Sequence, residues 1–461
     1  MRPSRATLAW AAGLAVAGPL ALAALARWLW AMTLDGPVLY GEGAVAHAAL
    51  LARERLEYVA GARYGDVAPI FTAANYPPLY FHLAGLGDPF VTGRAISGIS
   101  TILVAVMIAW RARAGGPLAS VTLGLAWLAT FPVVVWGVAV KPDLVALVLT
   151  VAAALALESR LSLVAGLLIA LAAFAKPTEL LPAFALAVAL ALVRDARALG
   201  LYAIGAAIGI LASTILTVAP DKNMYLHVVD WNALAFHFDQ SLLLTLVAVI
   251  AIGIPLLAVL FVRRAIPVPI VAYAVAGLAI MLLGGREGAT INYLLDLAAA
   301  AFLALAVSAA RLRASAVFAP AVAAQLLVTV LLFDPFGASR AGATGAWSDP
   351  ARIAAARAIE GQVLAEDSAL LVASGREPLV DDLFLWSRVY ERGRPFAEGD
   401  RLLEAVGARR LDAVVSEVDL ARLETAPAYE RQRWADALVK RILDGYRLDR
   451  RDGALFIYVR R

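Results

Sequence analysis

Long apolar runs, each close to the length of a membrane-spanning helix, recur along the first 333 residues of the chain. A hydrocarbon core of about 30 Å requires about 20 helical residues for one crossing. The runs therefore predict a mainly helical membrane protein with about eleven spans. They lie at residues 7–32, 91–109, 117–139, 141–157, 161–175, 177–193, 199–219, 241–262, 266–284, 293–310 and 315–333.

The hydrophobic pattern ends at Asp334, where a stretch rich in Gly, Ser and Ala replaces the apolar runs. We interpret residues 334–348 as a linker. Ser348 and Asp349, which precede Pro350, form a helix-start signal, and a helix to about residue 362 is expected after them. The linker thus separates the transmembrane region from a C-terminal part of different character.

The C-terminal part alternates short apolar runs with longer amphipathic stretches, which predicts strands and helices respectively. We expect a small α/β domain at residues 349–461, following a transmembrane region at residues 1–333. The strands are predicted at residues 369–373, 412–416 and 454–459, and the helices near residues 400–407 and 429–445.

The composition agrees with a membrane protein. Hydrophobic residues make up 62% of the chain and charged residues 16%, whereas soluble domains are about half apolar and about one-quarter charged. The absence of cysteine excludes disulfides and thiolate metal sites. The net charge of +4 is better explained by membrane topology and anionic lipid than by nucleic acid as a partner.

The positions of the arginines predict the orientation, because short cytoplasmic loops are enriched in Lys and Arg. If the N-terminus is cytoplasmic, every alternate loop obeys this rule. The C-terminal domain and the first outer loop, residues 33–89, are then extracytoplasmic, and we expect a multi-pass protein of the plasma (inner) membrane. The arginines concerned are Arg2, Arg5, Arg111, Arg113, Arg160, Arg194, Arg197, Arg263, Arg264, Arg311 and Arg313.

Carboxylates at the outer end of the first span are the first candidates for chemistry, since charge near hydrocarbon usually marks a pathway or a site. Asp35 and Glu42 stand just beyond the span, and Glu42 lies between Gly41 and Gly43. The glycines allow the backbone to bend and to approach a ligand closely. Glu42 is either a solvated loop carboxylate or a functional residue, which would be a general base or an acceptor-binding group.

Residues 45–59 carry an apolar stripe that predicts a helix lying on the membrane surface. Arg53, Glu54 and Glu57 fall elsewhere on the surface of this helix. His47 belongs to the same stretch, and we interpret it as an interfacial helix residue rather than a catalytic one. No metal-binding motif surrounds it.

The segment NYPPLYFHL, residues 75–83, precedes the second span and contains Tyr76. Its two prolines favour an extended turn before a helix start. Asp88 and Arg94 follow at the outer end of the same span. These residues belong either to a structural stop above the membrane or to a site.

Two Lys-Pro turns fall on the predicted outer side. Lys141 and Asp143 flank the proline of one, and Lys176 and Glu179 belong to the other. The lysines either extend their ammonium groups to the membrane surface or hold the phosphate of a lipid-linked substrate.

A glycine-rich turn opens the tenth span at residues 284–297. Arg286, Asn292 and Tyr293 stand on its predicted outer side. They complete the set of polar residues that gather at one face of the membrane.

The motifs YGEG, YPPLY, GR, KPD, KPT and NYLLDL, in this order along the membrane region, resemble the GT-C superfamily of membrane glycosyltransferases that use polyprenyl-phosphate sugars. They are similar to its bacterial branch related to the dolichyl-phosphate-mannose-protein mannosyltransferases (glycosyltransferase family 39). The resemblance implies a GT-C-like, all-α polytopic membrane protein with an extracytoplasmic α/β domain.

The resemblance also implies roles for individual residues. The family carries a catalytic acidic residue in the first outer loop, which Glu42 matches best, although Asp is more usual there. Lys141 and Lys176 match basic residues near the donor phosphate, and Arg286 is placed with them. Asp143 is a second catalytic candidate that orders Lys141 or binds the acceptor. Acceptor-binding or structural roles are open for Asp88, Arg94, Tyr76, Asn292 and Tyr293.

The reaction implied is inverting transfer of a hexose or pentose from a polyprenyl-phosphate donor to an extracytoplasmic glycan, lipid or protein. We expect neither a metal ion nor another cofactor, because this chemistry requires neither a nucleotide-binding fold nor a DxD metal motif. Two alternatives are a transporter or flippase of lipid-linked sugars and a non-catalytic protein that binds them. We find no inverted repeat of the kind expected for secondary transporters.

Overall fold

The computed structural model describes residues 4–461, apart from residues 60, 64–67, 218–222, 263–265, 310–314, 338–349 and 454. Most of the predicted linker lies outside the described residues, together with Ser348, Asp349, Arg2, Arg263, Arg264, Arg311 and Arg313.

The chain divides into two compact units. We call the first the helical unit; it comprises Met1–Met32, Ala95–Leu216 and Ala235–Ser339. We call the second the mixed unit; it comprises Thr33–Arg94, Thr217–Leu234 and Arg340–Arg461.

Each of the eleven predicted spans coincides with a helix, and one span is divided into two. The helices of the predicted spans are α1 (Arg5–Ala31), α4 (Pro89–Ala112), α5 (Pro117–Leu128), α6 (Phe131–Trp136), α7 (Asp143–Glu158), α8 (Ser162–Ala175), α9 (Leu180–Leu192), α10 (Ala196–Thr217), α11 (Phe238–Val262), α12 (Val268–Leu282), α13 (Leu295–Ser308) and α14 (Ser315–Phe333). The division between α5 and α6 follows from Pro132, which occupies the first turn of α6 and has no N–H to continue a preceding helix.

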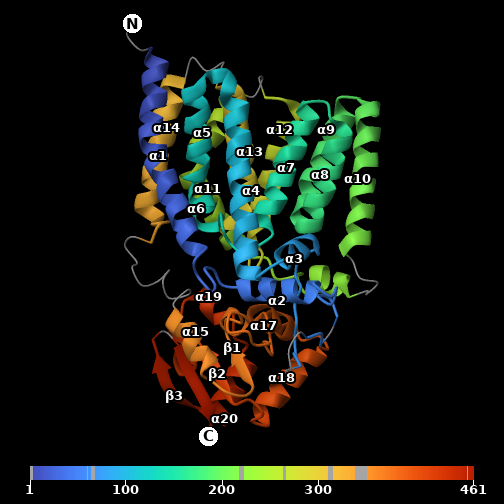
Figure 1. The fold of residues 1–461 in the computed structure, drawn as a ribbon, viewed down its shortest axis with the longest axis vertical. Helices are drawn as coiled ribbons and strands as arrows, with labels where there is room; N and C mark the ends of the chain where they lie inside the picture. Colours follow the sequence, from blue (N-terminus) through green and yellow to red (C-terminus); the bar gives the residue numbers. More distant parts are fainter. Residues whose placement is uncertain are drawn as a thin grey trace. The chain divides into compact units, whose positions relative to one another are not determined.

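Helix α13 forms the centre of the helical unit. The apolar window that contains it is 89% buried, whereas that of α10 is 22% buried. Helices α5, α7, α11 and α12 all pack against α13, and the long helices lie side by side (Figure 1). A helix that is apolar all round and buried is the expected core of a membrane bundle.

Within the described residues, six helices are long and apolar enough to cross a membrane, and several shorter apolar helices accompany them. The six are Arg5–Ala31, Pro89–Gly115, Ala196–Thr217, Phe238–Leu257, Val268–Gly285 and Ile291–Ser308. Large apolar side chains such as Ile208, Leu211 and Ile215 on α10 are exposed, as expected for a surface that faces lipid. The chain is therefore a multi-pass membrane protein.

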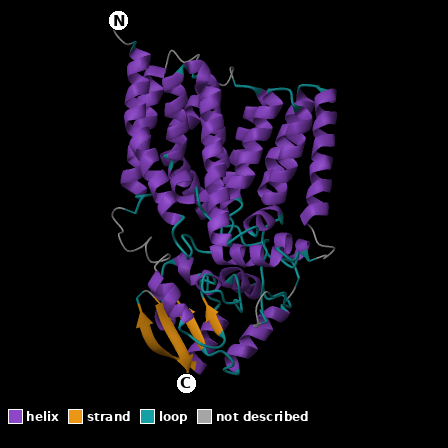
Figure 2. Cartoon of the chain, in the orientation of Figure 1, coloured by secondary structure: helices purple, strands orange, loops and turns teal. Residues whose placement is uncertain are grey.

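The mixed unit contains a four-stranded sheet in its C-terminal residues (Figure 2). The strands are β1 (Val363–Ala365), β2 (Ala413–Ser416), β3 (Tyr446–Asp452) and β4 (Leu455–Arg460), in the order β1-β2-β4-β3. Strands β1 and β2 are parallel, and the other two pairs are antiparallel. The helices that accompany the sheet are α15 (Pro350–Arg357), α16 (Ala369–Val372), α17 (Leu383–Glu391), α18 (Ala397–Gly407), α19 (Ala428–Arg431) and α20 (Asp436–Gly445).

The strand predictions at residues 412–416 and 454–459 are confirmed by β2 and β4, but the prediction at residues 369–373 is wrong. Ala369 begins the short helix α16, and its N–H donates to Asp367 Oδ1 at 3.0 Å. A short apolar run is compatible with either a buried strand or a buried helix, and the turn at Asp367 selects the helix.

The predicted surface helix at residues 45–59 is also wrong in extent and exposure. Helix α2 (Glu42–Ala52) ends before Glu57, and nearly all of its residues are buried. Glu57 is itself buried and pairs with His82 Nε2 at 3.2 Å. Helix α2 packs on α3 (Leu79–Ala84) and on α16, so the stripe read from the sequence faces protein.

Three distant segments of the chain share one core in the mixed unit. The Phe71 ring lies 4.8 Å from Trp231 and 5.6 Å from Phe396, measured between ring centroids. Phe71 also forms a parallel bridge with Val380. Residues of the first predicted outer loop therefore fold together with residues near 231 and with the C-terminal part.

Candidate functional site

Glu42 is the first residue of α2, and its carboxylate is held inside the mixed unit. Its Oε2 lies 3.4 Å from Arg94 Nη2, and both side chains are fully buried. The Val38 N–H donates to the same oxygen at 2.9 Å. Arg94 also donates to the carbonyl oxygens of Leu34, at 2.7 Å, and Gly36. The solvated-loop alternative for Glu42 is therefore wrong, because a buried carboxylate paired with a guanidinium stands there.

The two glycines beside Glu42 serve different purposes. Gly41 has a φ of 76°, in the left-handed region, and so supplies the bend expected from the sequence. A Cβ at Gly43 would lie 2.2 Å from the Ala369 nitrogen and 2.4 Å from Ser368 Oγ. The close approach at Gly43 is therefore made to the backbone at the start of α16.

His47 lies five residues after Glu42 on α2 and is fully buried. Its Nε2 is 2.7 Å from Glu377 Oε1, and its Nδ1 is 2.9 Å from Asp381 Oδ2. Burial by itself would lower the pKa of His47, but the hydrogen bonds to Asp381 and Glu377 raise it to about 9. His47 was expected on a helix that lies on the membrane surface, but it is fully buried between two carboxylates of the protein.

A second cluster lies in the helical unit and brings four of the predicted residues together. Asp143 Oδ1 is 2.7 Å from Lys176 Nζ and accepts a hydrogen bond of 2.7 Å from Asn292 Nδ2. Lys176 Nζ lies 5.1 Å from the centroid of the Tyr293 ring. All four side chains are buried. The ammonium and the carboxylate compensate each other inside a bundle of apolar helices.

Two further carboxylates adjoin this cluster and were not selected from the sequence as site residues. Glu179 Oε2 accepts a hydrogen bond from Thr150 Oγ1 at 2.8 Å, and Asp296 Oδ1 accepts one from Tyr273 Oη at 3.0 Å. Both carboxylates interact electrostatically with Lys176. The sequence contained a signal for both carboxylates, because Glu179 stands three residues after Lys176 and Asp296 stands in the NYLLDL motif.

Arg286 and Lys141 occupy turns of the helical unit. Arg286 Nη2 donates to Tyr293 Oη at 3.0 Å, which links Arg286 to the ring that lies beside the lysine cluster. Lys141 is buried, and Ser97 Oγ donates to the preceding turn at Ala139. The ion pair of Asp143 is formed with Lys176, a pairing that the sequence did not predict.

Asp88 and Tyr76 have structural explanations. Asp88 Oδ1 accepts hydrogen bonds of 3.0 Å from the N–H groups of Phe90 and Val91, so it caps the start of α4. The carbonyl oxygen of Tyr76 accepts a hydrogen bond of 2.6 Å from Tyr58 Oη. Both contacts favour the structural alternative given above for residues 75–83 and Asp88.

Among the described residues, no group of three or more His, Asp or Glu side chains has an arrangement that could hold a metal ion. The carboxylates instead pair with Arg94, Lys176 and His47.

Two solved structures of one protein resemble the whole chain. The crystal structure of ArnT from Cupriavidus metallidurans bound to undecaprenyl phosphate has a TM-score of 0.61 and 15% sequence identity, and covers 96% of this chain and 98% of that chain. The apo state of ArnT has a TM-score of 0.55 and 15% identity, over 95% of this chain and 96% of that chain.

An oligosaccharyltransferase from Archaeoglobus fulgidus tethered with an acceptor peptide has a TM-score of 0.47 and 13% identity, over 97% of this chain and 74% of that chain. No protein-family model and no curated protein matches the sequence. The likeness to ArnT extends over nearly the full length and confirms the GT-C fold expected from the sequence.

Proposed function

Because the chain has the GT-C fold, we propose that it is a membrane glycosyltransferase that moves a sugar from a polyprenyl-phosphate donor to an extracytoplasmic acceptor. The observation that carries the proposal is the full-length likeness to ArnT bound to undecaprenyl phosphate. The acceptor is a cell-envelope glycan, a lipid or a protein. The sugar is a hexose or a pentose.

The proposed reaction is an inverting displacement. The acceptor oxygen forms a bond to the anomeric carbon, and the bond from that carbon to the phosphate oxygen breaks, so that polyprenyl phosphate leaves with the bonding pair. A carboxylate receives the proton of the acceptor hydroxyl. Glu42 is the proposed base, because it is a buried carboxylate whose direction is fixed by Arg94 and by the Val38 N–H.

The proposed ligands of the leaving phosphate are Lys141, Lys176 and Arg286. An ammonium has three N–H donors, so Lys176 can bond Asp143 and still donate to a phosphate oxygen. Asp143 then serves to hold Lys176, and it is the second candidate for the base. Fixed cations near the leaving group stabilise the charge that develops on the phosphate.

The decisive experiment replaces Glu42 by Gln. Gln keeps the size of the side chain but cannot accept the hydroxyl proton, so we expect transfer to fall by about 10² to 10⁴-fold. The measurement is the release of undecaprenyl phosphate from a panel of undecaprenyl-phosphate-linked hexoses and pentoses, with envelope lipids and glycans as acceptors. Glu54→Gln is the matched control, because Glu54 is an exposed carboxylate just after α2.

The amide substitutions of Asp35, Asp88 and Asp143 are measured in parallel. If one of them abolishes transfer and Glu42→Gln does not, the base is that residue. If the wild-type protein releases no undecaprenyl phosphate from any donor of the panel, the enzyme proposal fails. Movement of the intact donor across a vesicle bilayer would then support the flippase alternative, and donor binding alone would support the non-catalytic one.

A further inference from the structure

Tyr40, two positions before Glu42, is held by the C-terminal part of the mixed unit, which comprises residues 350–461. The guanidinium carbon of Arg433 lies 3.9 Å from the centroid of the Tyr40 ring and 4.8 Å from that of Tyr429. Arg433 is buried and is fixed by Glu366 at 2.8 Å and Glu417 at 2.9 Å. A cation–π contact between the buried Arg433 and the partly buried Tyr40 therefore holds the chain just before α2.

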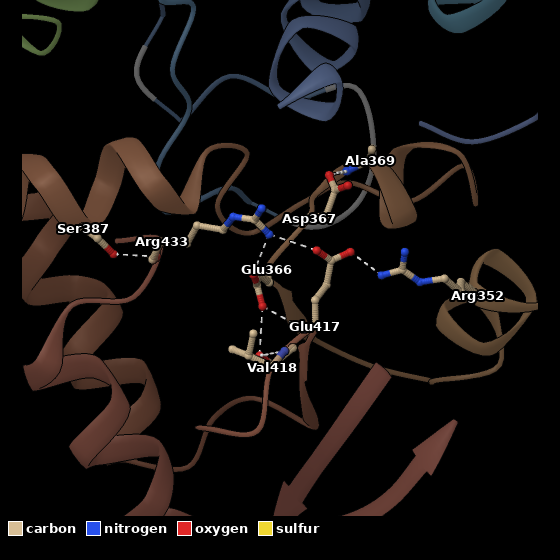
Figure 3. A network of polar contacts seen from close by, with 9 residues as sticks. Arg352, Glu366, Asp367, Ala369, Ser387, Glu417, Val418 and Arg433 are labelled. Atoms are coloured by element: carbon tan, nitrogen blue, oxygen red, sulfur yellow. Dashed lines mark hydrogen bonds and ion pairs between the residues drawn. The ribbon is translucent and has the colours of Figure 1, made fainter. Parts of the chain in front are cut away.

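Figure 3 shows that this arginine belongs to a larger network. Glu417 bridges Arg433 and Arg352, and Glu366 also accepts hydrogen bonds from the Glu417 N–H at 2.7 Å and from Ser416 Oγ at 2.9 Å. The network ties the ends of β1 and β2 to the segment before α20. Tyr40 is thus held by a rigid support.

The residue after Glu42 is held by α16. Gly43 approaches Ser368 and Ala369 so closely that a side chain at position 43 cannot be accommodated. Ser368 Oγ donates to the Asp381 carbonyl at 2.5 Å, so this contact is connected to the segment that binds His47.

His47 is the third contact. Glu377 and Asp381 face its imidazole from the segment between α16 and α17, and the Ala73 N–H donates to Asp381 Oδ1 at 2.8 Å. On the neighbouring elements, Asp367 precedes α16 and His82 of α3 pairs with Glu57. A protonated imidazole is the state that can donate to both carboxylates at once.

We propose that the C-terminal part of the mixed unit sets the position of the Glu42 carboxylate, and that His47 is the positioning residue that locks α2 against it. Three contacts with the C-terminal part, at Tyr40, Gly43 and His47, surround Glu42 in sequence. The carboxylate is then held in place through the helix that it begins. This inference rests on the proposed function of Glu42.

The first test replaces His47 by Gln and compares turnover with substrate affinity. We expect kcat for the undecaprenyl-phosphate sugar used by the wild-type protein to fall at least tenfold, while its KM changes less than about threefold. His237→Gln is the matched control, because His237 is partly exposed in the helical unit. An unchanged kcat in the folded His47→Gln protein would overturn the proposal.

The pH profile supplies a readout that a purely structural role would not move. Since the pKa of His47 is raised to about 9, we expect wild-type turnover to fall as the pH rises through about 9. The fall is expected to disappear in His47→Gln. If His47→Gln does not fold, Glu377→Gln takes its place in the comparison, because it removes one of the two carboxylates that contact His47. The pH profile of the wild-type protein can be measured in either case. A wild-type kcat that stays level from pH 7 to 10 contradicts the proposal.

A labelling experiment separates this inference from the proposed function. The chain has no cysteine, and Ala46 on α2 is fully buried, so Ala46→Cys introduces a single reporter. We expect slow maleimide labelling in the otherwise wild-type protein and labelling at least tenfold faster with His47→Gln added. If labelling behaves in this way but no sugar transfer is found, α2 is locked as described and the glycosyltransferase proposal fails. Equal labelling rates would show that His47 does not lock α2.

Discussion

Glu42 and Asp143 illustrate how this protein stabilises buried carboxylates. Taking a charge out of water is costly unless a partner compensates it. Arg94 does this for Glu42, and Lys176 together with Asn292 does it for Asp143. An amide substitution leaves the partner's charge uncompensated, as alanine does, but it keeps the side-chain volume and a hydrogen-bond acceptor for the cation, so it perturbs the pair less than alanine.

Asp367 is a buried carboxyl of a different kind. Burial and the nearby Glu417 charge raise its pKa from 3.8 to about 7, although the Ala369 N–H opposes the shift. Because the pKa is raised on folding, the protonated form stabilises the fold fully below pH 3.8, and this contribution is lost as the pH rises through about 7.

We therefore expect Asp367→Asn to reduce the pH dependence of stability. The wild-type Tm should fall between pH 5 and pH 8 by about 5 °C, and that of the variant by clearly less, since a buried amide takes up no charge. Thermal unfolding in detergent measures this. Asp449→Asn is the control at an exposed carboxylate. The same drop in both variants would contradict the raised pKa of Asp367.

The sequence could identify chemistry at single positions but not the partners of those positions. Glu42, Asp143 and Lys176 were selected as candidates because carboxylates and ammonium groups near membrane segments are rare. Glu377 and Asp381 were missed because they lie 330 and 334 residues from His47 and carry no spacing signal. Contacts over such separations are created by the tertiary fold.

At the scale of elements, close packing of α8 and α10 depends on small residues. A Cβ at Gly205 would lie 2.0 Å from the Leu163 carbonyl oxygen, and a Cβ at Gly166 would lie 2.0 Å from that of Tyr202. Small residues of this kind let the backbones of membrane helices approach each other. The hydrophobic pattern predicted both helices, but it carried no information about which helices pack together.

We expect Gly205→Ala to destabilise the protein by about 1 to 3 kcal/mol, because backbone atoms must move apart to admit the methyl group. Gly200→Ala is the matched control on the same helix, since a Cβ there meets nothing within 4 Å. That control should be neutral or slightly stabilising, because Ala favours a helix more than Gly does. Thermal unfolding compares the stabilities of the two variants. Equal Tm values would show that α8 and α10 are not in close contact.

At the scale of the whole molecule, the sequence predicted the GT-C fold because apolar length and motif order are local properties of the chain. It also predicted a sheet in the C-terminal residues. It did not predict that Thr33–Arg94 and Thr217–Leu234 would belong to the same compact unit as that sheet. The core that joins them includes Phe71, Trp231 and Trp386, which are far apart in sequence.

The predicted orientation is tested with reporter fusions. We expect an alkaline phosphatase fused after Arg461 to be active and a fluorescent reporter that folds only in the cytoplasm to be dark at the same position, because the arginines of alternate loops favour a cytoplasmic N-terminus. Fusions after Arg113 should give the reverse. A dark cytoplasmic reporter after Arg113 together with a bright one after Arg461 would invert the topology.

The mixed unit is built from segments that are far apart in the chain, and this has a consequence for biosynthesis. Glu42 leaves the ribosome early, whereas Glu377 and Asp381, which bind His47 of the same helix, are synthesised more than 300 residues later. At about 5 to 20 residues per second, the nascent chain spends roughly 17 to 67 seconds with α2 lacking these partners. The proposed base therefore cannot reach its final environment until translation is nearly complete, and a chain released early would insert into the membrane without becoming active.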